Sequence, residues 1–172
     1  NTKKRVNIVK SVQRSFRYES VFGRYHRLHL WALNKKKKLR NIVMKTFGKI
    51  VEDSRESLEI IDSNTLKDMM NNDEDMVIID VNDKEEIDQR GMIKGAINVS
   101  LGTLYYKADQ DVPENFKDNR IQDRNKKVVV TCGLGLCAAI GGKVLKDMGF
   151  KDVALLDGGV DKWVKDGNTL EK

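Results

Sequence analysis

The sequence predicts an α/β fold in which a mostly parallel sheet is covered by helices on both faces. Three observations support this prediction. Residues 76–81 and 128–132 are continuous, largely apolar runs, as expected for strands buried on both faces. Segments with helical spacing of apolar residues lie between such runs. The connections are short, as in repeated β-α-β units.

Five segments fit the strands of this sheet. The fourth begins after a polar stretch, residues 107–127, which contains Pro113 and is expected to cross the surface. In chain order the five predicted strands cover residues 58–61, 76–81, 95–99, 128–132 and 153–156.

Helices are predicted between these strands. Asp62 or Ser63 can cap a first helix, because their side-chain oxygens accept from free backbone N–H groups. A short charged helix covers residues 85–90, and the helix after the fourth strand ends at Gly149. A last helix carries Trp163.

Charge divides the 172-residue chain into two regions. Residues 1–50 contain fifteen Lys and Arg against one acid, Glu19, which gives a net charge of +14. The whole chain carries +6, so the other 122 residues carry −8. We therefore expect a basic N-terminal extension, residues 1–55, followed by one domain, residues 56–172.

The extension has the pattern of an organelle-targeting segment. It is poor in acids, and Val9, Val12 and Phe16 are spaced to share a helical face among basic residues. We expect a mitochondrial or other organelle location, and otherwise a cytoplasmic one. Disordered sequence is an alternative, and binding to nucleic acid is the least favoured, so no nucleic-acid partner is expected. The apolar run at 28–33 is shorter than the ~20 residues that a membrane span needs, so no transmembrane segment is expected.

Cys132 is the candidate nucleophile. It ends the fourth predicted strand, at the sheet edge where open α/β folds bind their ligands. A helix N-terminus just after it stabilises a thiolate, and flexible glycines let the loop amides point inward around an anion. The predicted substrate-binding loop consists of Gly133, Leu134, Gly135, Leu136, Cys137 and Ala138. A small hydrophobic cysteine that ends a core strand is the alternative.

Residues from about 58 to 167 resemble a rhodanese domain. The resemblance rests on the order and spacing of five pieces: Val77-Ile78-Ile79-Asp80-Val81, Gly95-Ala96-Ile97-Asn98-Val99, Val129-Val130-Thr131-Cys132 with Gly135, Gly149-Phe150, and Leu156-Asp157-Gly158-Gly159 with Trp163.

The resemblance implies a five-stranded parallel sheet and a sulfurtransferase with Cys132 as its catalytic cysteine. That cysteine would take the outer sulfur of thiosulfate or a persulfide, carry it as a persulfide, and pass it to cyanide, a thiol or a protein acceptor. No metal or organic cofactor is implied. The expected partners are therefore a small sulfur donor and a thiol or protein acceptor, and the donor must be able to reach the thiol.

Three positions depart from the family. Cys137 stands where many members have an arginine, so the loop has no basic side chain, and thiosulfate is expected to bind weakly. Asn82 stands where arginine is frequent, and Met92 where histidine is frequent; both positions are usually structural. Asp80 and Asp157 are expected to form hydrogen bonds at strand ends and turns.

Several alternatives stay open at the sequence level. Cys137 could resolve an oxidised Cys132 as a disulfide, or it could be a buried thiol, which we favour. The pattern Gly133-x-Gly135-x-x-Ala138 imitates a dinucleotide-binding fingerprint. A phosphatase is disfavoured because no loop arginine would offset the charge of the transition state. The main rival is a non-catalytic rhodanese-like module that binds a partner or senses oxidants.

Overall fold

The computed structural model of the protein describes residues 45–72 and 74–172. These residues belong to one compact unit, Lys45–Lys172. The predicted targeting pattern falls on residues 1–44, outside the described part of the chain. Within the described part, no helix is both long and apolar enough to cross a membrane.

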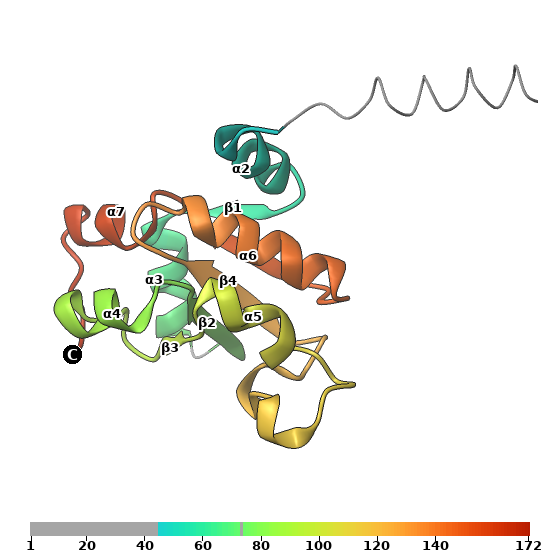
Figure 1. Ribbon diagram of the computed structural model, residues 1–172. Coiled ribbons are helices and arrows are strands. Elements are labelled where there is room, and N and C mark those ends of the chain that lie inside the picture. The colour runs from blue at the N-terminus through green and yellow to red at the C-terminus, as the bar shows by residue number, and fades with distance from the viewer. Residues whose placement is uncertain (1–44, 73) are drawn as a thin grey trace, which may run out of the picture. The chain divides into compact units, whose positions relative to one another are not determined.

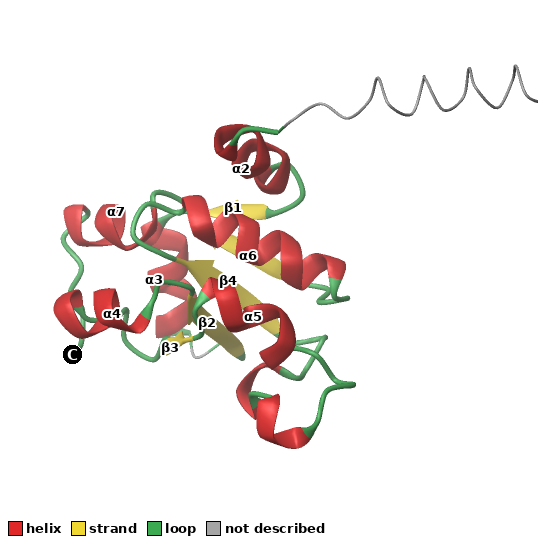
Figure 2. Cartoon of the chain, in the orientation of Figure 1, coloured by secondary structure: helices red, strands yellow, loops and turns green. Residues whose placement is uncertain are grey.

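The sheet has five strands, all parallel to their neighbours (Figure 2). Their spatial order is β1-β5-β4-β2-β3, so β4 lies at the centre between β5 and β2. The mostly parallel five-stranded sheet is thereby confirmed. The strands are β1 Glu59–Ile61, β2 Met76–Asp80, β3 Ile97–Asn98, β4 Lys127–Thr131 and β5 Val153–Leu156.

Six α-helices accompany the sheet in the described residues (Figure 1). Two of them, α2 and α5, were not expected from the sequence, whereas the other four were. The helices are α2 Phe47–Arg55, α3 Ser63–Asn71, α4 Lys84–Arg90, α5 Leu101–Lys107, α6 Leu136–Asp147 and α7 Gly159–Lys165.

Two apolar cores lie on the two faces of the sheet. Val128 and Val130 of β4 belong to one core, which α2, α5 and α6 also line. Val129 belongs to the other, which α3 and α7 line. Because successive side chains of a strand point to opposite faces, the continuous valine run fills both cores. Helices therefore cover both faces, as predicted.

Local signals place the ends of several elements. The Asp62 carboxylate accepts from Thr65 N–H at 2.8 Å and caps α3. Gly149 has a φ of +92° just after α6, a conformation that glycine adopts without strain. The polar stretch before β4 contains two 3₁₀ turns, Glu114–Phe116 and Asn119–Ile121. Ile121 anchors that stretch in the core.

Candidate active site

Cys132 directly follows β4 at the carboxyl edge of the sheet. The last residue of β4, Thr131, pairs in register with Asp80, the last residue of β2. The strands β2 and β4 therefore end at the same edge of the sheet, where open α/β folds place their ligands. The structure brings together at this edge the cysteine and the loop that the sequence singles out.

The Cys132 thiol lies at the N-terminus of α6. Its Sγ accepts the backbone N–H of Ala138, with 3.4 Å between N and S. Ala138 is the third residue of α6, and the N–H groups of a first helical turn have no partner within the helix. These N–H groups and the aligned peptide dipoles favour negative charge at the site without a cationic side chain.

The loop depends on a glycine at position 135. Gly135 has a φ of +80°, and a Cβ there would lie 3.3 Å from the Leu156 carbonyl oxygen. A larger residue would therefore be strained in its backbone and crowded by β5. This glycine allows the chain to turn sharply from Cys132 into α6.

The start of α7 supports the loop from the opposite side. Val160 N–H donates to the Cys132 carbonyl at 2.9 Å, and Asp161 N–H donates to the Gly133 carbonyl at 3.0 Å. Gly159 makes this approach possible, since a Cβ on it would lie 2.2 Å from the Cys132 carbonyl oxygen. Sequence reasoning missed this role, although the Gly158-Gly159 pair after a buried strand was its signal.

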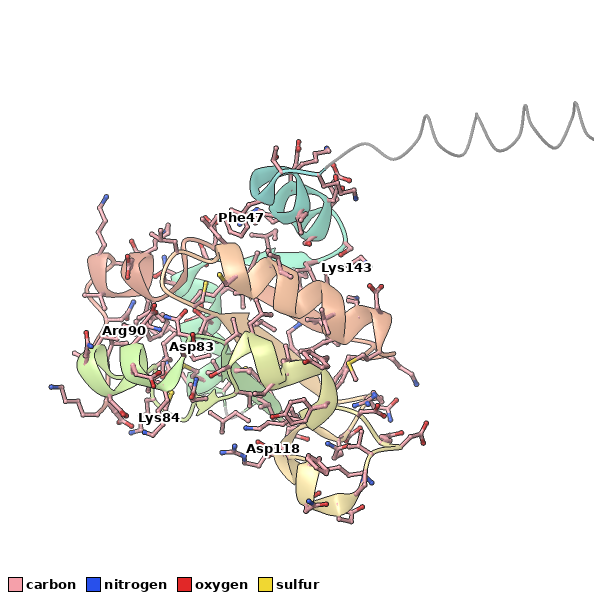
Figure 3. All side chains as sticks on the ribbon, in the orientation of Figure 1. Phe47, Asp83, Lys84, Arg90, Asp118 and Lys143 are labelled. Atoms are coloured by element: carbon pink, nitrogen blue, oxygen red, sulfur yellow. The ribbon has the colours of Figure 1, made fainter. Side chains whose placement is uncertain are left out.

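The electrostatic surroundings of the loop are acidic. Burial raises the pKa of the Cys137 thiol, and the nearby charges of Cys132, Glu86 and Asp83 raise it further. Asp83 lies at the start of α4, whose last residue is Arg90 (Figure 3). Loop residues 133–138 contribute no basic side chain. An incoming anion therefore meets backbone amides and carboxylates, with no cation on the loop itself.

The thiol is less accessible than we expect from the sequence. Cys132 is only 3% exposed and belongs to the core that α2, α5 and α6 line. The outer face of the loop is apolar: Leu134 is 62% exposed and Leu136 is 38% exposed. Because the thiol is buried, a molecule from solvent reaches it only with some displacement of its surroundings.

A buried ion pair supports the end of β2 beside the loop. The Asp80 carboxylate is wholly buried and accepts from Arg90 Nη2 at 2.8 Å and from Asn82 N–H at 3.1 Å. Burial raises the pKa of Asp80, while these two partners act in the opposite direction. On the other side of the site, Arg55 donates to Asp157 at 2.9 Å. Both aspartates thus form hydrogen bonds at strand ends.

A family model of the rhodanese-like domain matches residues 62–166. This chain belongs to the rhodanese-like domain family. The matched region contains the sheet edge, Cys132 and the glycine loop. The glycines at 133 and 135 therefore lie within a rhodanese-like domain, which argues against the dinucleotide-binding interpretation.

Relatives of this rhodanese-like domain include tRNA uridine(34) hydroxylases from several strains of Staphylococcus aureus. They are 38% identical over 98 residues, which cover 56% of this chain and 29% of the relative. The chain thus matches less than a third of the length of these relatives.

Solved structures show the same fold. A protein of unknown function from Rhodopseudomonas palustris, described as a possible tyrosine phosphatase, has a TM-score of 0.69 and 27% identity, covering 76% of this chain and 98% of that chain. A human single-domain sulfurtransferase has a TM-score of 0.56 and 18% identity, and the match covers 63% of this chain and 97% of that chain. A rhodanese-like domain protein from Staphylococcus aureus has a TM-score of 0.52 and 22% identity, covering 67% and 100%.

Metal ligands do not gather in the described part of this rhodanese-like domain. Residues 45–72 and 74–172 contain no group of three or more His, Cys, Asp or Glu side chains that could hold a metal ion. Cys132 and Cys137 are both free thiols.

Proposed function

We propose that this rhodanese-like domain is a sulfurtransferase that carries sulfane sulfur as a persulfide on Cys132. The observation that carries the proposal is the contact between Cys132 Sγ and the Ala138 N–H at the N-terminus of α6. A thiolate held in this way is a nucleophile, and the same amides can hold the sulfur that it accepts. Membership of the rhodanese-like family supports sulfurtransferase-type activity.

The loading step exchanges one sulfur–sulfur bond for another. The Cys132 thiolate attacks the outer sulfur of a persulfide R–S–SH, a new bond forms from Sγ to that sulfur, and the old bond breaks. The electron pair of the broken bond leaves with R–S⁻, so atoms, charge and electrons balance. An acceptor thiolate or cyanide then attacks the outer sulfur, and Cys132 leaves as a thiolate. The backbone N–H groups of Gly133, Leu134, Gly135, Leu136, Cys137 and Ala138 supply the donors around that sulfur.

We propose persulfides, rather than thiosulfate, as the preferred donors. Thiosulfate brings two negative charges to a loop that has no basic side chain and lies within the electrostatic influence of Glu86 and Asp83. The reacting sulfur group of a persulfide carries at most one negative charge. The exposed Leu134 and Leu136 suit the apolar part of such a donor or of the acceptor.

One rival rests on a specific observation. The low exposure of Cys132 favours a partner-binding module in which the thiol does not turn over. Phosphatase activity is not proposed, because no loop arginine is present to stabilise the charge that develops on a transferring phosphoryl group. A nucleic-acid partner is not proposed for the domain either, since residues 51–172 carry a net charge of −8.

A sulfur-transfer assay distinguishes the sulfurtransferase from a non-catalytic binding or redox-sensing module. Glutathione persulfide is supplied as donor, cyanide as acceptor, and thiocyanate is measured for the full chain, Cys132→Ser and Cys137→Ser. We expect catalytic turnover by the full chain, none above background by Cys132→Ser, and nearly full activity in Cys137→Ser. Absence of turnover by the full chain would favour the non-catalytic module.

A further inference from the structure

Asn82 lies beside the cysteine loop. Asp80 and Thr131 pair at the ends of β2 and β4, and Asn82 and Gly133 each lie two residues beyond this pair. A Cβ built on Gly133 would lie 3.9 Å from Asn82 Nδ2, and no other non-neighbouring atom would come within 4 Å. The side-chain amide of Asn82 thus faces the space that a side chain at Gly133 would occupy.

The amide nitrogen of Asn82 is unpaired. Nδ2 is buried and has no hydrogen-bond partner among the described residues. A buried donor without an acceptor is unfavourable, so natural proteins keep few of them, and each one calls for an explanation. A ligand atom that is absent from the unloaded protein would supply the missing acceptor.

The rest of Asn82 is held firmly in place. Its backbone N–H donates to Asp80 at 3.1 Å, and its carbonyl accepts from Asn98 Nδ2 at 2.7 Å and Ser100 Oγ at 3.2 Å. Asp80 is itself held by Arg90, whose Nε and Nη1 are further buried donors without partners. The fold therefore fixes the backbone of Asn82 and leaves its side-chain donor free.

We propose that the Asn82 amide donates a hydrogen bond to the transferred sulfur of the Cys132 persulfide. This inference rests on the proposed function and adds a substrate-contacting residue outside the loop. The outer sulfur of a persulfide is an acceptor that bears negative charge, and it extends beyond the Sγ that Ala138 already contacts. A neutral amide suits a sulfur donor of low charge, in agreement with persulfides as the substrate class.

Two substitutions test the amide from different directions. Asn82→Ala removes the donor. Gly133→Ala keeps it but places a methyl group 3.9 Å from Nδ2, an ordinary van der Waals distance that the fold accommodates. Each substitution has a matched control. Asn64→Ala removes an asparagine side chain at an exposed position in α3, and Gly102→Ala adds a Cβ that would meet nothing within 4 Å.

The readouts are the rate of persulfide formation on Cys132 from glutathione persulfide, the pH profile of its discharge by cyanide, and thermal unfolding. We expect Asn82→Ala to slow loading about tenfold, as for loss of one hydrogen bond to a charged group. The midpoint of the discharge profile should rise by about one pH unit, because the persulfide anion loses a donor. Thermal stability should not fall, because Nδ2 has no partner in the unloaded protein. Gly133→Ala should also slow loading and raise the midpoint of the discharge profile. The two control variants should change neither readout.

The outcomes separate this inference from the function on which it rests. A wild-type chain that accepts no sulfur overturns both. A wild-type chain that loads, with Asn82→Ala loading equally fast and an unchanged pH profile, overturns the role of Asn82 alone. Slower loading accompanied by a loss of thermal stability, with an unchanged pH profile, would mark Asn82 as a structural residue and would also overturn it.

Discussion

The backbone carbonyl of Cys132 accepts a hydrogen bond from the N–H of Val160, with 2.9 Å between nitrogen and oxygen. This bond joins the end of the central strand β4 to the start of α7, on the side of the loop opposite α6. The position of Cys132 thus depends on a helix that begins 27 residues later in the chain. Gly159, the residue before Val160, is what permits the contact.

Gly159→Ala should disrupt the loop. The residue has a φ of +62°, and its Cβ would lie 2.2 Å from the Cys132 carbonyl oxygen. Gly95→Ala is the matched control, because φ is +76° there but a Cβ would meet nothing within 4 Å. We expect the control to lose about 1–2 kcal/mol of unfolding free energy from the left-handed backbone alone. Gly159→Ala should lose at least about 2 kcal/mol more in urea denaturation. Equal losses would show that the close approach is unimportant.

Arg90→Met should destabilise the protein in a pH-dependent way. It leaves the buried Asp80 carboxylate without its cation, which costs about 3–5 kcal/mol when a buried pair is broken. Burial already raises the pKa of Asp80, and removing Arg90 should raise it further. A folded-state pKa above the unfolded one means that folding takes up a proton, so stability should recover as pH falls through the folded-state pKa.

Urea denaturation at pH 7 and pH 5 measures this recovery. The matched control is Arg55→Met, whose partner Asp157 is 43% exposed, in contrast to the wholly buried Asp80, so the loss should be at most about 1 kcal/mol at either pH. A penalty for Arg90→Met as small as that of the control would contradict the importance of the buried pair.

The sheet was the part of the fold most open to prediction. Residues 76–80 and 127–131 are buried almost throughout, and a continuous apolar run specifies such strands directly. Helix α5 was missed because its seven residues include Gly102 and bury only Leu104, so no apolar stripe is visible. Helix α2 was missed because it spans the boundary drawn between the basic extension and the domain, and it buries only Val51 and Ser54.

The candidate site was predictable only in its local part. Cys132, its glycines and the following helix are contiguous, so their spacing alone suggests a thiol at a helix N-terminus. The support from Gly159 depends on β5 being the neighbour of β4, which no local pattern specifies. The approach of Asn82 to Gly133 likewise follows from the pairing of β2 with β4. The low exposure of Cys132 results from packing of the whole domain.

Cys137 should react slowly with alkylating reagents up to high pH. Burial, followed by the charge of Cys132, raises its pKa above the ordinary value of 9.0. In Cys132→Ser the charge is removed but the burial stays, so the midpoint of Cys137 alkylation should move down yet remain above 9.0. Peptide mapping after iodoacetamide at a series of pH values measures this midpoint.

A Cys137 thiol that stays protonated is a poor resolving group, so mild oxidation should not produce a loss of two hydrogens from the intact mass. Such a loss, absent in Cys137→Ser, would restore the resolving role.

Cys137→Arg should improve the use of thiosulfate. It places a cation at the loop position that otherwise presents a partly buried thiol, and a hydrogen bond to a charged group contributes about 1.5–3 kcal/mol. We expect the rate of loading from thiosulfate to rise about tenfold, with a smaller effect on loading from glutathione persulfide. Cys137→Leu is the uncharged control. If Arg and Leu behave alike, weak recognition of thiosulfate does not arise from the missing charge.

Intact-mass spectrometry of the full chain after incubation with glutathione persulfide tests the central claim most directly. The account predicts an added mass of one sulfur atom that requires Cys132, is absent in Cys132→Ser, and disappears when cyanide is added. If neither glutathione persulfide nor thiosulfate adds sulfur to Cys132, the thiol is not a sulfur carrier. The domain would then be a binding or redox-sensing module.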